Sequence, residues 1–115
     1  LKPENTVVDK KGYLIMIDMG TAKMLRNRTA IGPLLSLERS LHGALSYLGK
    51  GYSFPVDIWA LGVILYEMVC GKLPYGENLN DPVDIYKEII KTKLKFPKYY
   101  KEETGKELMK KLLLK

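Results

Sequence analysis

The apolar stretch IWALGVILYEMVC (residues 58–70) limits the folds open to this chain more than any other feature of its sequence. The stretch has thirteen residues and contains Glu67, whereas a bilayer-spanning helix needs about 20 uninterrupted apolar residues. We therefore expect no transmembrane segment but a core helix over residues 56–70, ended by Gly71. Because a helix that is apolar on nearly every face must be surrounded by protein, it is expected to lie at the centre of a globular core.

The composition of the 115 residues, with 46% hydrophobic and 28% charged residues, is that of a globular chain of one domain at most. A single cysteine, Cys70, excludes an internal disulfide framework and favours a reducing, cytoplasmic location. The net charge is +6, and nine lysines lie between Lys91 and Lys115. No zinc-ligand spacing and no aromatic-glycine RNA-binding signature accompany them. We therefore expect a solvated basic surface and no nucleic-acid partner.

Two short β-rich runs, residues 6–8 and 14–17, are joined by a polar turn in which Gly12 can supply a positive φ. Antiparallel pairing of these runs brings Asn5 and Asp18 together at the open end of a hairpin, although thirteen residues separate them. An amide oxygen beside a carboxylate is a ligand pair suited to Mg²⁺ with bound phosphates. Lys2 adds a cation nearby, and such a set of groups is what transfer of a nucleotide phosphoryl group requires.

Two more helices are expected after the core helix. Asp81 and Pro82 are typical of an N-cap and a first helical position. They open a helix with Ile85 and Ile89 on one face, Tyr86 and Ile90 beside them, and a break at Pro97. A last helix from about residue 102 is expected to bury four side chains, those of Leu108, Met109, Leu112 and Leu113.

Three stretches of the chain resemble segments of the protein kinases in the order and near the spacing of that family: LKPEN (1–5), IDMGTAK (17–23) and GYSFPVDIWALGVILYEMVCGKLPY (51–75). They are similar to the catalytic loop, to the metal-binding Asp-Phe-Gly segment with Met19 in place of phenylalanine, and to the central helix of the large lobe. Residues 49–67 and 81–97 most resemble the cyclic-GMP-dependent kinases, particularly those of protists. The resemblance implies a mainly α fold with a short β-hairpin, a partial C-terminal lobe of a protein-kinase-like fold over residues 1–115.

The resemblance also implies roles for individual residues. Lys2 would contact the transferred phosphate of ATP, and Asn5 and Asp18 would hold Mg²⁺. Asp57 would be a buried carboxylate that supports the backbone of the catalytic loop, although an acidic residue is also favoured in the first turn of any helix. Thr29 would be an activation-loop phosphorylation site, and the alternative is a loop hydroxyl without that role.

Residues 33–48 depart from the kinase pattern, because PLLSLERSLHGALSYL stands where the family has the Thr-Pro and Ala-Pro-Glu of its substrate-docking segment. The leucines of this stretch recur at helical spacing, which favours an amphipathic helix. The codons of SLHGA (40–44), read one base later, can encode His-Tyr-Met-Ala-Pro, a usual form of the kinase segment. We favour the hypothesis of a shifted reading frame or a misassigned intron, with a genuine insertion as the second interpretation.

Two classes of function agree with these observations. The first is a serine/threonine protein kinase of the cyclic-nucleotide-dependent type, which would use ATP and Mg²⁺ on a protein substrate. The catalytic aspartate of the family would lie just before Leu1, and the small lobe and a regulatory region would lie further upstream. We therefore expect these 115 residues alone to be inactive and their core helix to be partly uncovered. The second class is a non-catalytic kinase-like scaffold that binds partner proteins.

Overall fold

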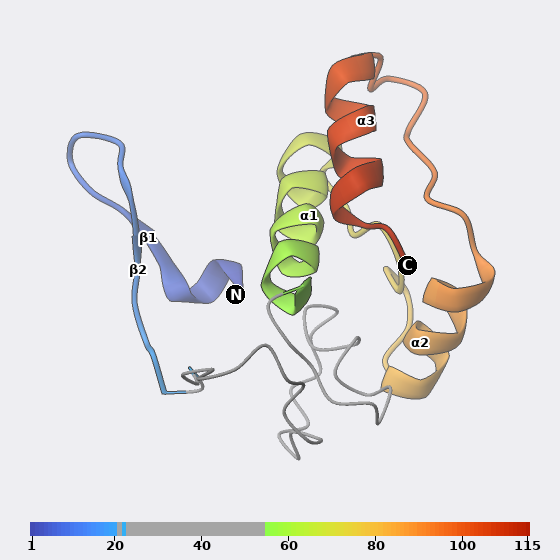
Figure 1. The fold of residues 1–115 in the computed structure, drawn as a ribbon, viewed down its shortest axis with the longest axis horizontal. Helices are drawn as coiled ribbons and strands as arrows, with labels where there is room; N and C mark the ends of the chain where they lie inside the picture. Colours follow the sequence, from blue (N-terminus) through green and yellow to red (C-terminus); the bar gives the residue numbers. More distant parts are fainter. Residues whose placement is uncertain (21, 23–54) are drawn as a thin grey trace.

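The computed structural model of the protein describes residues 1–20, 22 and 55–115. A 3₁₀ turn, η1 (Pro3–Asn5), leads into an antiparallel pair of strands, β1 (Thr6–Val8) and β2 (Leu14–Met16). Within residues 55–115, three helices follow: α1 (Pro55–Cys70), α2 (Pro82–Lys91) and α3 (Glu103–Leu112). Figure 1 shows the hairpin to one side of the helices, and α1 next to α3. The predicted mainly α fold with a short β-hairpin is therefore confirmed.

The turn of the hairpin is held by the carboxylate of Asp9. Its Oδ1 accepts hydrogen bonds from the backbone N–H groups of Lys11 (2.8 Å) and Tyr13 (2.9 Å). Gly12 adopts a φ of +89°, the left-handed conformation that the sequence assigned to it. The predicted pairing of the two runs is confirmed, except that β2 ends at Met16, one residue earlier than expected.

Helix α1 ends as predicted at Cys70, because Gly71 adopts a φ of +66° and donates its N–H to the carbonyl of Glu67 (2.8 Å). One side of α1 is buried through Trp59, Ala60, Gly62, Val63, Tyr66 and Cys70. The other side leaves Ile58, Leu61 and Met68 exposed. With these exposed side chains, α1 is partly uncovered in the part of the chain that the structure describes, as expected. Within the described residues, no helix combines the length and apolar character that crossing a membrane requires.

The contact between α1 and α3 depends on Gly62. A Cβ atom on Gly62 would lie 2.8 Å from Cβ of Leu112 and 3.0 Å from the side chain of Leu113. Of the four α3 side chains predicted to be buried, Met109 (0% exposed) and Leu113 (3%) are buried, and Leu112 is half-buried. The prediction for Leu108 is wrong, since it is 49% exposed. Met109 and Leu113 are four residues apart and share one face, whereas Leu108 lies about 100° around the helix from Met109.

Helix α2 begins as predicted. The side chain of Asp81 caps it by accepting a hydrogen bond from the N–H of Val83 (2.8 Å), Pro82 is its first residue, and Ile85 and Ile89 are buried. The predicted end at Pro97 is wrong, because the helix ends at Lys91. At the next position, Thr92 has extended backbone angles (φ −104°, ψ 134°). An extended chain from this point lets alternate side chains turn inward, and the apolar Leu94 and Phe96 do so.

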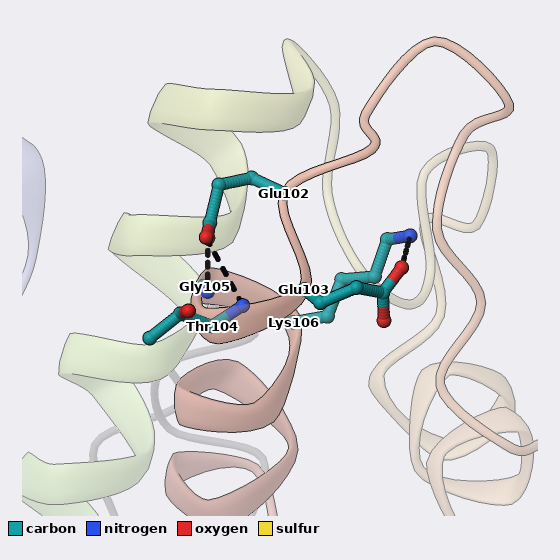
Figure 2. A network of polar contacts seen from close by, with 5 residues as sticks. All are labelled: Glu102, Glu103, Thr104, Gly105 and Lys106. Atoms are coloured by element: carbon teal, nitrogen blue, oxygen red, sulfur yellow. Dashed lines mark hydrogen bonds and ion pairs between the residues drawn. The ribbon is translucent and has the colours of Figure 1, made fainter.

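Glu102 is the N-cap of α3, so the helix begins close to the predicted start. Its carboxylate accepts hydrogen bonds from the backbone N–H groups of Thr104 (3.1 Å) and Gly105, as Figure 2 shows. One turn into the helix, Nζ of Lys106 lies 2.6 Å from Oε1 of Glu103. The bonds to Glu102 satisfy two N–H groups that have no partner inside the helix, and Glu102 and Glu103 put negative charge at its N-terminus.

Among the described residues, most of the buried apolar side chains fall into two clusters. The first joins α1, α2 and the end of α3 through Trp59, Val63, Tyr75, Ile85, Ile89 and Leu113, and the second consists of Tyr66, Cys70 and Met109. Burial, and next to it the thiol of Cys70, raises the pKa of Tyr66 to about 12. Burial also raises the pKa of the Cys70 thiol. Both groups are therefore neutral at physiological pH and act as part of the core.

Candidate functional site

The 3₁₀ turn at the start of the chain brings Lys2 and Asn5 close together. The carbonyl of Lys2 accepts hydrogen bonds from the N–H of Asn5 (3.1 Å) and from the hydroxyl of Thr6 (3.4 Å). Pro3 follows Lys2 at the first position of the turn, where its fixed φ is compatible with the helical conformation. Lys2 and Asn5 are both partly buried. Lys2 and Asn5 are three residues apart and therefore lie one turn apart on the same side of the 3₁₀ turn.

The hairpin then joins Asn5 to the segment that contains Asp18. Thr6 pairs with Met16 in the sheet, and one step outward the N–H of Ile17 donates to the carbonyl of Asn5 (2.8 Å). Asp18 is the next residue along the chain. The predicted meeting of Asn5 and Asp18 at the open end of the hairpin is therefore confirmed, while their functional roles stay predictions.

Asp18 has a backbone conformation that is uncommon for a residue with a side chain. Its φ is +59°, in the left-handed region that aspartate tolerates better than most residues. Its Oδ1 accepts a hydrogen bond from the N–H of Gly20 (3.0 Å). This bond fixes the orientation of the carboxylate and leaves its other oxygen available to a cation.

The donor groups at this end of the hairpin fit Mg²⁺. The ion takes oxygen ligands, and in nucleotide sites it is held by one or two protein groups while phosphates and water complete the octahedron. The amide oxygen of Asn5 and the second oxygen of Asp18 are donors of this kind. Within residues 1–20, 22 and 55–115, no cluster of three or more His, Cys, Asp or Glu side chains could hold a metal ion by itself. Asn5 and Asp18 could supply two of the oxygen ligands of Mg²⁺, and water and phosphate oxygens would supply the others.

The structure contradicts one property predicted for Asp57. Its side chain is 62% exposed, so the expectation of a buried carboxylate is wrong. Asp57 stands in the first turn of α1, where the end of the helix meets solvent and favours a negative charge. Its Oδ1 nevertheless lies 3.3 Å from the terminal ammonium nitrogen of Leu1, with which it forms an ion pair. This contact connects α1 to the segment that carries Lys2 and Asn5.

Two of the predicted features lie outside the described residues. They are the candidate phosphorylation site Thr29 and the segment 33–48 that departs from the kinase pattern. Both stay predictions from the sequence.

Gly20 is a site residue to which the sequence analysis gave no role. A Cβ atom at this position would lie 3.0 Å from Oδ1 of Asp18, so the glycine permits the close approach that the hydrogen bond requires. The sequence contains a signal for it, because an aspartate two residues before a glycine is a frequent turn arrangement.

Comparison with known proteins agrees with this arrangement. A family model described as "protein kinase domain" matches residues 1–115. The chain therefore belongs to the protein kinase domain family. It is 42% identical over 115 residues to a cGMP-dependent protein kinase of Plasmodium berghei, a match that covers 98% of this chain and 13% of that kinase.

Other relatives include a cGMP-dependent protein kinase of Toxoplasma gondii, 41% identical over 115 residues, or 98% of this chain and 11% of the kinase. A "cAMP-dependent protein kinase, catalytic subunit-like" of Caenorhabditis elegans is 40% identical over 119 residues, or 98% of this chain and 27% of the relative. The chain thus spans between a tenth and about a quarter of the length of these relatives. The predicted resemblance to cGMP-dependent kinases of protists is confirmed.

Proposed function

We propose that this chain is part of a serine/threonine protein kinase of the cyclic-nucleotide-dependent type, which transfers the γ-phosphate of ATP to a protein hydroxyl. The proposal is supported by two backbone hydrogen bonds, Asn5 to Lys2 and Ile17 to Asn5, which join the segments of Lys2, Asn5 and Asp18 at the open end of the hairpin in a chain of the protein kinase family. The names of the relatives, cGMP- and cAMP-dependent protein kinases, support the regulatory class.

The proposed reaction breaks the bond between the γ-phosphorus and the β,γ-bridging oxygen of ATP, so that ADP leaves, and forms a bond to the substrate hydroxyl oxygen, whose proton would pass to the catalytic aspartate expected just before Leu1. Lys2 would hold the transferred phosphate by charge, because an ammonium group neutralises the negative charge that three phosphoryl oxygens share. Asn5 and Asp18 would hold Mg²⁺, which when bound neutralises phosphate charge. The hydrogen bond from Gly20 to Asp18 would keep that carboxylate in the orientation required for a metal ligand.

Two further residues have proposed roles outside the phosphate site. Asp57 would support the backbone of the LKPEN segment, and its contact with the nitrogen of Leu1 (3.3 Å) favours this role even though its side chain is exposed. Thr29 would accept an activating phosphate, a proposal that rests on its position three residues before Gly32. The cytoplasmic location expected from the cysteine usage likewise stays a prediction.

The second candidate function, a non-catalytic kinase-like scaffold, is favoured by one observation. Residues 33–48 differ from the family segment that docks substrate, so a chain that is translated as written would lack this surface. Such a chain could keep the core around α1 and still bind partner proteins.

The transcript that encodes these residues separates the two candidates. A kinase requires Arg-Asp codons just before Leu1, a glycine-rich loop further upstream, and a frame that restores Met-Ala-Pro near residues 42–44. The polypeptide from that transcript should then transfer ³²P from ATP to a serine peptide. Asp18→Asn should lower its rate about 10²-fold, and Asp9→Asn in the hairpin turn should not. A start codon with neither upstream feature, followed by an in-frame message as written and no phosphoryl transfer, would contradict the kinase proposal.

A further inference from the structure

The segment between α2 and α3, which we call the lysine segment (residues 91–101, KTKLKFPKYYK), has a high density of one charge. It contains five lysines and no acidic residue. Figure 1 shows it as an extended stretch on the side of the helices away from the hairpin. The side chains of Lys91, Lys93, Lys95, Lys98 and Lys101 are all exposed. Like charges held this close repel one another, so the arrangement has a cost that an anionic partner would remove.

The backbone of the lysine segment is anchored to the core. The hydroxyl of Tyr66 in α1 donates to the carbonyl of Lys95 (2.7 Å), and the ring of Phe96 lies 5.6 Å from that of Tyr66. Leu94 packs against both core clusters. Nζ of Lys115 donates to the carbonyl of Thr92. The segment is therefore held in one conformation before any partner arrives, and this lowers the entropy cost of binding.

Partly buried apolar residues and exposed lysines alternate along residues 93–96. Leu94 and Phe96 face the core, so Lys93 and Lys95 face solvent with one residue between them. In the part of the chain that the structure describes, neither lysine forms an ion pair. Beside them, the ring of Tyr99 is 68% exposed, and its hydroxyl donates to the carbonyl of Cys70, which fixes the ring in place.

We propose that the lysine segment is a docking surface for an acidic segment of a partner protein that binds in an extended conformation. Alternate residues of an extended peptide are about 7 Å apart, so glutamates at every second position match the spacing of Lys93 and Lys95. The opposite charges of the lysine segment and the acidic peptide would direct their association. The fixed ring of Tyr99 offers the peptide an apolar contact next to the lysines. Single-stranded nucleic acid fits less well, because it favours several exposed aromatic rings and Tyr99 is the exposed one within residues 91–101.

The proposal is independent of phosphoryl transfer, and peptide binding tests it directly. The probe is a fluorescein-labelled twelve-residue peptide of alternating glutamate and serine, titrated with the full 115-residue chain and followed by anisotropy. The variant Lys93→Glu/Lys95→Glu reverses two charges in the lysine segment. The matched control, Lys10→Glu/Lys11→Glu, makes the same change in net charge at the exposed hairpin turn on the opposite side of the molecule. Emission of the single, buried Trp59 verifies that each protein is folded.

We expect the variant in the lysine segment to bind the peptide about tenfold more weakly, and the hairpin variant to change binding less than about twofold. Equal losses in both variants would overturn the proposal, because binding would then follow net charge alone. Tighter binding of an oligouridylate of equal length, with the same dependence on Lys93 and Lys95, would overturn it in favour of RNA. If the double reversal disturbs folding, Lys93→Ala/Lys95→Ala replaces it, and undiminished binding by that folded variant overturns the proposal.

Discussion

The hydroxyl of Tyr66, in the middle of α1, donates a 2.7 Å hydrogen bond to the backbone carbonyl of Lys95, twenty-nine residues further along the chain. The bond joins the central helix to the extended connection between α2 and α3. Because the side chain of Lys95 is exposed and its carbonyl is bound to buried Tyr66, one hydrogen bond contributes both to the stability of the core and to the conformation of the lysine segment.

Tyr66→Phe should therefore destabilise the fold by about 1–2 kcal/mol, because the carbonyl of Lys95 loses its donor while the ring of the new phenylalanine still fills the site. The measurement is urea unfolding followed by the emission of Trp59. Tyr13→Phe, in the exposed hairpin turn, is the matched control and should change the free energy of unfolding by less than roughly 0.5 kcal/mol. Equal effects of the two variants would contradict a specific role for the Tyr66 hydroxyl.

The stability of the fold should fall in alkaline solution, and Tyr66 should contribute to this fall. Burial raises the pKa of Tyr66 from 10.0 to about 12, so between these values the folded protein keeps a proton that the unfolded chain has released. The free energy of unfolding therefore decreases as the pH rises through this window and does not depend on Tyr66 ionisation below it. The difference in stability between the wild type and Tyr66→Phe should be constant up to about pH 10 and shrink above it. A difference that stays constant to pH 12 would contradict the raised pKa.

Gly62→Ala should destabilise the contact between α1 and α3 by about 1–3 kcal/mol, because the added methyl group would lie 2.8 Å from Cβ of Leu112. Alanine has a higher helix propensity than glycine, so this substitution by itself should stabilise α1. A measured loss of stability would therefore be due to the steric conflict with Leu112. Thermal unfolding measures the effect. Leu108→Ala, on the exposed face of α3, is the control and should have little effect. A Gly62→Ala protein as stable as the wild type would show that the two helices can move apart without cost.

The elements that the sequence predicted well are those whose signals are local. Asp81 and Pro82 mark the start of α2, and Gly71 marks the end of α1, because a cap or a left-handed residue acts within one turn of the chain. The errors concern tertiary contacts. Leu108 has the same chemistry as its buried neighbours, and only the direction from which α1 approaches α3 decides that it is exposed.

The same distinction applies to the candidate site. The meeting of Asn5 and Asp18 could be predicted, since strand pairing follows from the β-rich runs and the turn between them. The exposure of Asp57 depends on what covers the first turn of α1, and the sequence holds no local signal for this. The end of α2 at Lys91 was missed for a related reason: the inward contacts of Leu94 and Phe96 favour an extended chain well before Pro97.

Glu102→Ala should destabilise α3 by about 1 kcal/mol, because the carboxylate accepts hydrogen bonds from two N–H groups in the first turn (Figure 2). The effect should appear as faster amide hydrogen exchange at Thr104 and Gly105 and as a lower midpoint of urea unfolding. Glu107→Ala removes the same charge from an exposed position of the same helix and is the control. If both variants lose stability equally, the contribution of Glu102 is general electrostatics and not capping.

Gly20→Ala should weaken metal binding at the open end of the hairpin without unfolding the core. The new Cβ would lie 3.0 Å from Oδ1 of Asp18, so the hydrogen bond from the N–H of residue 20 would be disturbed and the carboxylate would turn. Groups that orient a metal ligand typically contribute a factor of ten or more, so we expect about tenfold weaker binding of Mn²⁺ used as a paramagnetic substitute for Mg²⁺. The measurement is electron paramagnetic resonance of free Mn²⁺ in the presence of ATP, with the polypeptide that the complete transcript encodes. Gly71→Ala, which strains a left-handed residue far from the site, is the control for a general loss of stability. Equal Mn²⁺ affinity in the wild type and Gly20→Ala would contradict a positioning role for the Gly20–Asp18 bond, and the hairpin alone would then orient the two proposed ligands, Asn5 and Asp18.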